Sequence, residues 1–139
     1  MTARQSYHLT FARFSPSLSV RSFTASEAVN TAYRVEITAT STDSSLPLSS
    51  YLNQRAAFEI HPQEGLLSEV VSAFGSASDD LPAKQWQGII TSCEKLSVSK
   101  DETVYRFVLE PRFAALKHFQ TSRLFQHQTV PDIVAAVFK

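Results

Sequence analysis

The stretch Val104-Tyr105-Arg106-Phe107-Val108-Leu109-Glu110-Pro111 decides how the chain is expected to fold. Its apolar side chains at Tyr105, Phe107 and Leu109 recur at every second residue, which is the spacing of a strand with one face on a core. Pro111 has no backbone N–H to give to a sheet, so it marks the end of the strand. The stretch therefore predicts a half-buried strand that stops at Pro111 and leads into a different kind of segment.

The same two-residue period recurs through most of the chain. It predicts further strands over 7–12, 18–23, 33–40 and 84–97. Gly88, inside the last of these, indicates a bend, a bulge or a close approach of another backbone. Strands of this kind, separated by short helices, are typical of a mainly β fold, and we expect an antiparallel β-barrel or a curled sheet.

Helical signals are few and short. Thr24-Ala25-Ser26-Glu27 has the spacing of a capping box and predicts one or two helical turns before Tyr33. Three more short helices are expected over 46–52, 112–119 and 132–139, and the last is the clearest because its apolar residues share one face behind a proline.

The segment 66–74 fits both helix and strand spacing, and we favour a strand there, followed by a polar loop over 75–82. With 139 residues, the chain has the length of a single domain, 1–139. The apolar face of its last helix needs a partner surface, which indicates an N-terminal fragment of a longer protein.

Charge and hydropathy exclude several classes of protein. The chain carries 13 basic and 13 acidic residues, and no basic block concentrates the positive charge that a nucleic-acid binder needs. It has no apolar run of about 18 residues, so no membrane span is expected. The N-terminus also lacks the apolar stretch of a signal peptide. We expect assembly in the cytoplasm and, if the protein leaves the cell, export by a dedicated machine.

Residues with reactive side chains do not form a recognisable catalytic or metal-binding pattern. Cys93 lies in a strand pattern, where a small buried hydrophobic role is the better interpretation. Asp79-Asp80 fits a solvated turn better than an acid–base pair. The histidines lack metal-ligand spacing, and they are His8, His61, His118 and His127. We expect no enzymatic activity, no cofactor and no metal.

Three larger side chains admit two interpretations each. Trp86 is expected in a core or an interface, although an exposed aromatic residue on a barrel can also stack on a single nucleic-acid strand. Arg112 and Arg123 could pair with a carboxylate such as Glu110, Glu94 or Asp132, or they could contact another subunit. The sequence leaves both interpretations of the arginines open.

Several segments, taken in order, are similar to those of one family. Leu18 to Phe23 with Glu27 and Tyr33 is similar to a strand and an x-G-x-E turn, with Ala25 in place of the glycine. The other similar segments are Leu48 and Leu52 (a "dLL" helix), Trp86 to Thr91 (aromatic-x-G-I-V-T), Tyr105 to Arg112 (Y-x-L-x-L-x-P), and Arg123 to Gln126 with Val130 to Ile133 ("sRiFQ…svpdIi"). On these segments the chain resembles the N-terminal part of VgrG, the type VI secretion spike protein, and the related hub proteins of contractile phage tails. Residues 61–83 depart most from the pattern.

The resemblance implies an architecture and a set of partners. Members of this family form trimers with two related barrels per chain, and the resulting ring sits on a hexameric tube of Hcp-type protein and carries a β-helical needle. This chain would supply the first barrel. The implied partners are two further copies of the longer protein, the Hcp-like tube protein, and effector or baseplate proteins, with no nucleic acid.

The resemblance also marks residues that are expected to hold the barrel together, and we call them the hub motif residues. They are Phe23, Glu27, Tyr33, Trp86, Gly88, Tyr105, Pro111, Arg112, Arg123, Phe125, Gln126, Pro131 and Ile133. Seven side chains are expected to pack and stiffen the barrel, namely Phe23, Tyr33, Trp86, Tyr105, Phe107, Phe125 and Ile133.

The sequence and the resemblance together predict a structural function, as one barrel of the trimeric hub that mounts the puncturing needle of a type VI secretion spike. Two alternatives remain at this stage. One is a baseplate hub of a contractile phage or prophage tail. The other is a β-barrel that binds a ligand or single-stranded nucleic acid.

Overall fold

A single antiparallel sheet of six strands organises the part of the chain that the computed structural model describes, residues 6–61 and 84–138. The strands are β1 (Ser6–Phe11), β2 (Ser19–Ala28), β3 (Thr31–Ser41), β4 (Arg55–His61), β5 (Lys84–Val98) and β6 (Thr103–Glu110). The strand favoured over 66–74 and the loop expected over 75–82 lie outside the described residues. The expected mainly β, antiparallel fold is confirmed.

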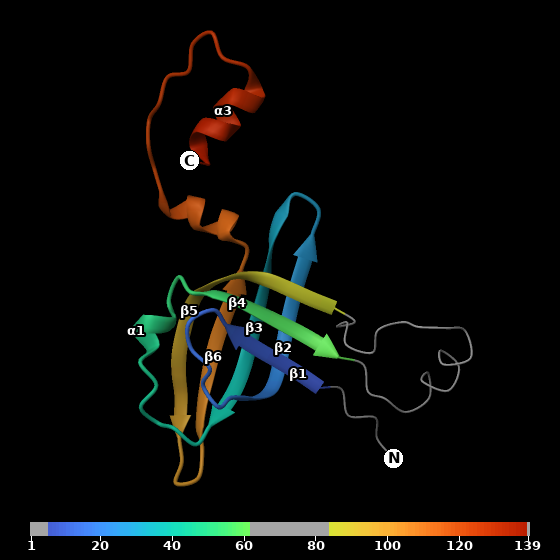
Figure 1. Ribbon diagram of the computed structural model, residues 1–139, viewed down its shortest axis with the longest axis vertical. Helices are drawn as coiled ribbons and strands as arrows, with labels where there is room; N and C mark the ends of the chain where they lie inside the picture. The colour runs from blue at the N-terminus through green and yellow to red at the C-terminus, as the bar shows by residue number, and fades with distance from the viewer. Residues whose placement is uncertain (1–5, 62–83, 139) are drawn as a thin grey trace, which may run out of the picture.

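The sheet is curled into a half-barrel (Figure 1). Its strand order is β1-β4-β5-β6-β3-β2, so β1 and β2 are the two edges. No ladder of backbone hydrogen bonds joins these edges within the described residues. They meet instead through side chains, because the rings of Tyr7 on β1 and Phe23 on β2 lie edge to face with centroids 5.3 Å apart. The expected barrel therefore takes the curled form, held together at its open side by aromatic packing.

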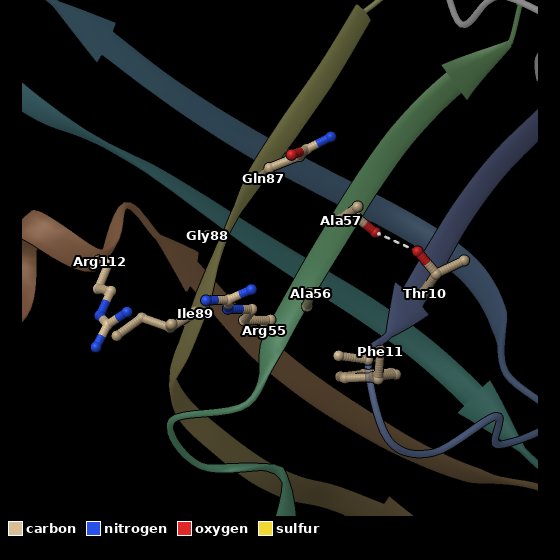
Figure 2. Close-up of a pocket in the computed structure, with 10 residues that line it drawn as sticks. Thr10, Phe11, Arg55, Ala56, Ala57, Gln87, Gly88, Ile89 and Arg112 are labelled. Atoms are coloured by element: carbon tan, nitrogen blue, oxygen red, sulfur yellow. Dashed lines mark hydrogen bonds between the residues drawn. The ribbon is translucent and has the colours of Figure 1, made fainter.

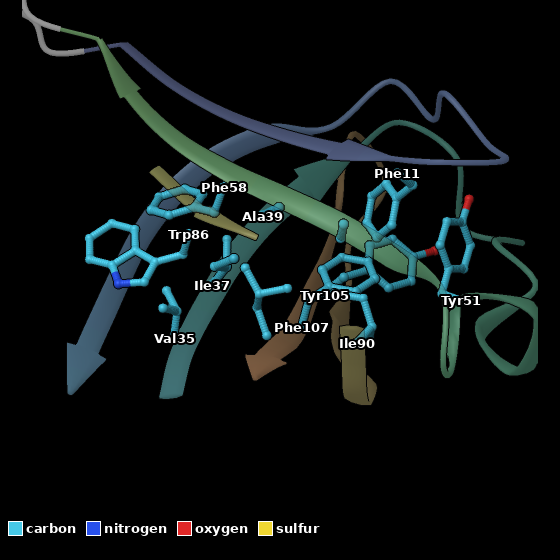
Figure 3. Packing of buried hydrophobic residues seen from close by; sticks show 12 residues of the cluster. Phe11, Val35, Ile37, Ala39, Tyr51, Phe58, Trp86, Ile90, Tyr105 and Phe107 are labelled. Atoms are coloured by element: carbon cyan, nitrogen blue, oxygen red, sulfur yellow. The ribbon is translucent and has the colours of Figure 1, made fainter. Parts of the chain in front are cut away.

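Alternation along each strand fills the concave face. On β6, Tyr105, Phe107 and Leu109 are fully buried, as the two-residue period predicted. The core runs the length of the sheet, with Trp86 and Phe58 towards one end (Figure 3). It consists of Phe11, Val35, Ile37, Ala39, Tyr51, Ala56, Phe58, Trp86, Ile90, Tyr105, Phe107 and Leu109.

The expected helical turn at Thr24–Glu27 is wrong, because these residues continue strand β2. Thr24 pairs with Glu36 and Ser26 with Arg34 on β3, so cross-strand hydrogen bonding overrides the local capping pattern. The ladder is irregular between Ser26 and Ala28, and the turn to β3 contains Asn30 at a φ of 62°. Asparagine tolerates this left-handed conformation better than most residues do. The result is a long hairpin that carries Glu27 near its tip.

The three remaining expected helices are present. α1 (Leu48–Tyr51) is a single turn that contributes Tyr51 to the core, and η1 (Arg112–His118) is a 3₁₀ helix that starts directly after Pro111. α3 (Val130–Val137) begins with a capping box between Thr129 and Asp132. Residues 119–138, which we call the C-terminal arm, run away from the sheet, and α3 lies apart from it (Figure 1).

Candidate functional site

Aromatic hub motif residues gather at one end of the concave face. The rings of Phe23 on β2 and Phe58 on β4 have centroids 4.9 Å apart, and Trp86 on β5 stacks against Phe58 at 5.9 Å. Phe23 also contacts Trp86 at 6.3 Å. Because β2 and β4 are not neighbours in the sheet, these contacts span the half-barrel and link its two sides. Trp86 is 7% exposed, so it lies in the core, as one of its two interpretations predicted.

Glu27 connects the tip of the β2–β3 hairpin to β5. Its carboxylate accepts a hydrogen bond of 2.6 Å from Trp86 Nε1 and one of 2.9 Å from Lys84 Nζ. These bonds favour the ionised form, so the hydrogen bond from Lys84 and then that from Trp86 lower the pKa of Glu27. The ammonium of Lys84 also lies 5.0 Å from the centre of the Trp86 ring. Glu27 thereby satisfies the only polar atom of a tryptophan side chain that is otherwise in the core.

Tyr33 and Gly88 form a second crossing of the concave face. The hydroxyl of Tyr33 donates to the backbone carbonyl of Gln87, and burial, followed by the negative charge of Glu27, raises the pKa of Tyr33. A methyl group at Gly88 would overlap the carbonyl oxygen of Glu110 on β6 and crowd the Tyr33 hydroxyl. The close backbone approach that was one expectation for Gly88 is confirmed.

Tyr105 and Pro111 act at the two ends of β6. The hydroxyl of Tyr105 donates to the carbonyl of Asp43 at 2.7 Å and ties the loop before α1 to the core. Lys95 Nζ lies 6.0 Å from the centre of the Tyr105 ring and donates to the carbonyl of Ser44 in the same loop. Pro111 is the N-cap residue of η1, so it ends the strand as expected.

Glu110 lies on the outer face of β6. The sequence analysis expected it to pair with Arg112 or Arg123, and the structure gives it other partners. It is 5% exposed, and its carboxylate accepts hydrogen bonds from Thr91 at 2.5 Å and from Lys117 of η1 at 3.2 Å, with Arg34 at 3.8 Å. Burial alone would raise the pKa of Glu110, but the bonds from Thr91 and Lys117 and the charges of Lys117 and Arg34 lower it overall. This network fastens η1 to the sheet.

The expected ion pairs of Arg112 and Arg123 are not formed within the described residues. Glu94 pairs instead with Arg106 on the neighbouring strand, at 2.7 Å. The carboxylate of Asp132 accepts from Thr129 in the capping box of α3. Of the two interpretations of these arginines, a pair with Glu110, Glu94 or Asp132 is therefore wrong within the described residues, and a subunit contact stays a prediction.

The C-terminal hub motif residues are not brought to the concave face. Phe125 and Ile133 are half-buried but lie outside the core, so the expectation that they pack the barrel is wrong for the described residues. The reason is that helical spacing identifies an apolar face without naming the surface that covers it. Pro131 occupies the first turn of α3, where its missing N–H is tolerated. The exposed members of this group are Arg123, Gln126 and Pro131.

The cysteine and two of the histidines take part in packing and hydrogen bonding. Cys93 packs against the core, its thiol donates to the carbonyl of Leu48, and burial, followed by the charge of Glu94, raises the pKa of this thiol. His8 and His61 meet edge to face at 5.1 Å, and His61 Nε2 lies 3.1 Å from Glu59. Among the described residues, no three acidic, histidine or cysteine side chains are placed to hold a metal ion. Nor does any helix in these residues have the length and apolar character to cross a membrane.

The outer face has a depression of about 430 Å³ where β1, β4 and β5 lie side by side (Figure 2). Thr10, Ala57 and Gln87 pair across the three strands and alternate with core residues, so their side chains face away from the core. Arg55, Ile89 and Arg112 line the same depression. None of the aromatic hub motif residues takes part in it.

Comparison with known proteins identifies relatives of the whole arrangement. Residues 26–139 match the family model described as phage tail baseplate hub (GPD). The chain is 29% identical over 122 residues to the type VI secretion system spike protein VgrG4b of Pseudomonas aeruginosa. This match covers 88% of the chain and 13% of that protein.

A solved structure shares the fold. It is the E. coli c3393 protein, described as a component of the type VI secretion system with structural similarity to the T4 bacteriophage tail proteins gp27 and gp5. The TM-score is 0.73 at 27% sequence identity, covering 94% of this chain and 31% of that one. The chain thus spans less than a third of either relative. Because the family model covers most of its residues, the chain belongs to the phage tail baseplate hub (GPD) family.

Proposed function

We propose that this chain is one structural barrel of a trimeric hub that mounts the puncturing needle of a type VI secretion spike on a tube of Hcp-like protein. The observation that carries the proposal is the fold of this chain. It matches the structure of a type VI secretion component over 94% of this chain. The sequence relative is a spike protein of the same system. The trimer, the tube and any effector or baseplate partner are parts of the proposal.

The way the sheet is built suits a part that transmits force. Strands β3, β4, β5 and β6 are each hydrogen-bonded on both sides, and the edge strands are linked by aromatic side chains across the concave face. Load on one strand therefore passes to its neighbours through many backbone hydrogen bonds at once. The concave face is filled by the core, which fits a solid element better than a binding barrel.

The C-terminal arm provides the surface through which this barrel would join the rest of the hub. Its apolar side chains include Phe119 at 72% exposure and Leu124 at 83%. Its end touches η1 through the rings of Phe138 and Phe113, with centroids 5.9 Å apart. Exposed apolar surface of this kind marks protein contacts, so we assign the arm to contacts within the trimeric hub.

The domain acts without catalysis in this proposal, and it leaves the cell with the spike. The competing single-strand binding function loses its main support, because Trp86 lies in the core and offers no exposed ring for a base to stack on. The family name and the T4 similarity of c3393 favour a second candidate, the hub of a contractile phage or prophage tail.

A deletion experiment separates the two candidates. Deleting the gene in its host should abolish release of the Hcp-like tube protein into the medium, and expression in trans should restore it. Unchanged release of tube protein, together with loss of tail particles after prophage induction, would instead establish the phage candidate. Native mass spectrometry of the complete protein should show three copies, and a monomer would contradict the trimeric hub.

A further inference from the structure

The outer depression holds two arginines that have no counter-charge among residues 6–61 and 84–138. Arg55 begins β4, Arg112 begins η1, and neither forms an ion pair with any residue that the structure describes. In the view of Figure 2, Ile89 lies between their two guanidinium groups. Two guanidinium groups that line one depression repel each other, so an anion between them would relieve the repulsion.

The carboxylate that could have neutralised them is already engaged. Ile89 pairs in register with Arg55 on one side and with Glu110 on the other, which makes Glu110 the acidic residue of this row. Its carboxylate is bonded to Thr91 and Lys117 and lies near Arg34. Among the residues that the structure describes, the depression is therefore left with an excess of positive charge, in a chain whose net charge is zero.

Three of the side chains that line the depression can donate hydrogen bonds into it, and its floor is apolar. Arg55, Arg112 and the amide of Gln87 supply the donors, whereas Ile89 and Ala57 supply the floor. A guanidinium presents paired N–H groups in a fork that matches the two oxygens of a carboxylate. The donors of the depression are thus complementary to an acidic group, and its apolar floor is complementary to an aliphatic chain beside that group.

We propose that this depression docks a segment of a partner polypeptide that places an aspartate or glutamate beside an aliphatic side chain. Nucleic acid is the poorer occupant, because two arginines over an apolar floor do not form a positive groove that follows a phosphate backbone. The inference stands whether the assembly is a secretion spike or a phage tail, so it does not depend on the proposed function. Under this proposal Arg112 contacts a partner polypeptide, which is the second of its two interpretations from the sequence.

The test uses the isotopically labelled 139-residue chain and two peptides, N-acetyl-Val-Glu-Val amide and N-acetyl-Val-Gln-Val amide, followed by NMR. The glutamate peptide should cause saturable shifts at the side-chain N–H signals of Arg55, Arg112 and Gln87. The pairs between the peptide carboxylate and the two arginines contribute modestly to the binding free energy because they are exposed. The glutamine peptide should therefore bind about three- to tenfold more weakly. Equal binding of the two peptides would overturn the proposal.

Matched variants separate the site from general charge effects. Replacing both arginines of the depression (Arg55→Gln with Arg112→Gln) should weaken binding of the glutamate peptide by a similar factor. Arg21→Gln, which removes an exposed positive charge on β2 outside the depression, should leave binding unchanged. The proposal fails if Arg21→Gln weakens binding as much as the double variant does. It also fails if octathymidylate or inorganic phosphate shifts the same signals at lower concentration than the peptide.

Discussion

Apolar side chains of the curled sheet and of the C-terminal arm differ in what covers them. In the sheet, Trp86, Phe58 and Tyr105 are buried by strands of the same chain, and their polar atoms have partners within it. In the arm, Leu124 and Val130 are largely exposed. The difference teaches that the sheet can be stable by itself, whereas the arm is built to be completed by another surface.

Replacing Trp86 is expected to have the largest effect on the sheet. Trp86→Ala removes the ring that stacks on Phe58 and leaves a cavity, so the free energy of unfolding should fall by about 3–5 kcal/mol. Urea denaturation followed by circular dichroism measures this fall. Trp86→Phe keeps a ring and loses the bond to Glu27, so it should be clearly less damaging. An unchanged unfolding midpoint in Trp86→Ala would show that the concave core does not stabilise the half-barrel.

Gly88→Ala tests the closest backbone approach in the sheet. The added methyl group would overlap the Glu110 carbonyl, which can move only with its strand, so we expect a loss of about 1–3 kcal/mol or more. Gln87→Ala, at the neighbouring exposed position, is the control and should change stability by less than about 0.5 kcal/mol. Equal thermal midpoints for both variants would mean that β5 and β6 can separate without cost.

Glu110 fastens η1, the segment between the sheet and the arm, to the sheet, and its contribution to stability should depend on pH. Its pKa in the folded protein is below the ordinary value, so its stabilising contribution is present above the unfolded-state pKa and is lost as the pH falls through the folded-state pKa. At pH 7, Glu110→Gln should lower the free energy of unfolding by about 1–3 kcal/mol. Below the folded-state pKa the difference from the parent chain should shrink.

The measurement is urea denaturation of both proteins at pH 7 and again at pH 3, with Glu102→Gln at an exposed position as the control. The control should stay within about 0.5 kcal/mol of the parent at pH 7. A difference for Glu110→Gln that grows towards acid pH would contradict the assignment of an ionised, paired carboxylate.

Leu124→Ser should have the smallest effect on the isolated chain and a large effect on assembly. Leu124 is 83% exposed, so its replacement should change the free energy of unfolding by less than about 0.5 kcal/mol. In the complete protein, the same change should reduce the fraction of trimer seen by light scattering. Loss of stability in the isolated chain would show that the arm already packs on its own sheet.

Two-residue alternation predicted five of the six strands and the core of β6 because each such pattern reports burial on one side of a strand. The helical turn at Thr24–Glu27 was mispredicted because a capping pattern is local, whereas the pairing of β2 with β3 is tertiary. The Glu110 network could not be predicted, since Arg34 and Thr91 reach it from β3 and β5, and alternation along one strand does not reveal which strands flank it. Strand spacing gives the side of the sheet that a residue faces and not its partner across the fold.

The resemblance grouped residues that the structure divides between the two regions. Glu27, Tyr33 and Trp86 converge on the concave face, and the bond between Glu27 and Trp86 joins residues 59 apart in sequence. Arg123, Phe125 and Ile133 lie in the arm, away from that cluster. A motif read along the chain does not distinguish residues that hold one domain together from residues that face its neighbours.

Hydrogen exchange measured by mass spectrometry, on the chain alone and within the assembled trimer, tests the central contrast most directly. Strands β3 and β6 should exchange slowly in both samples because their amides are bonded within the sheet. Residues 119–138 should exchange rapidly in the chain alone and become protected in the trimer. Equal protection of these residues in both samples would contradict the assignment of the arm as a surface completed by a partner.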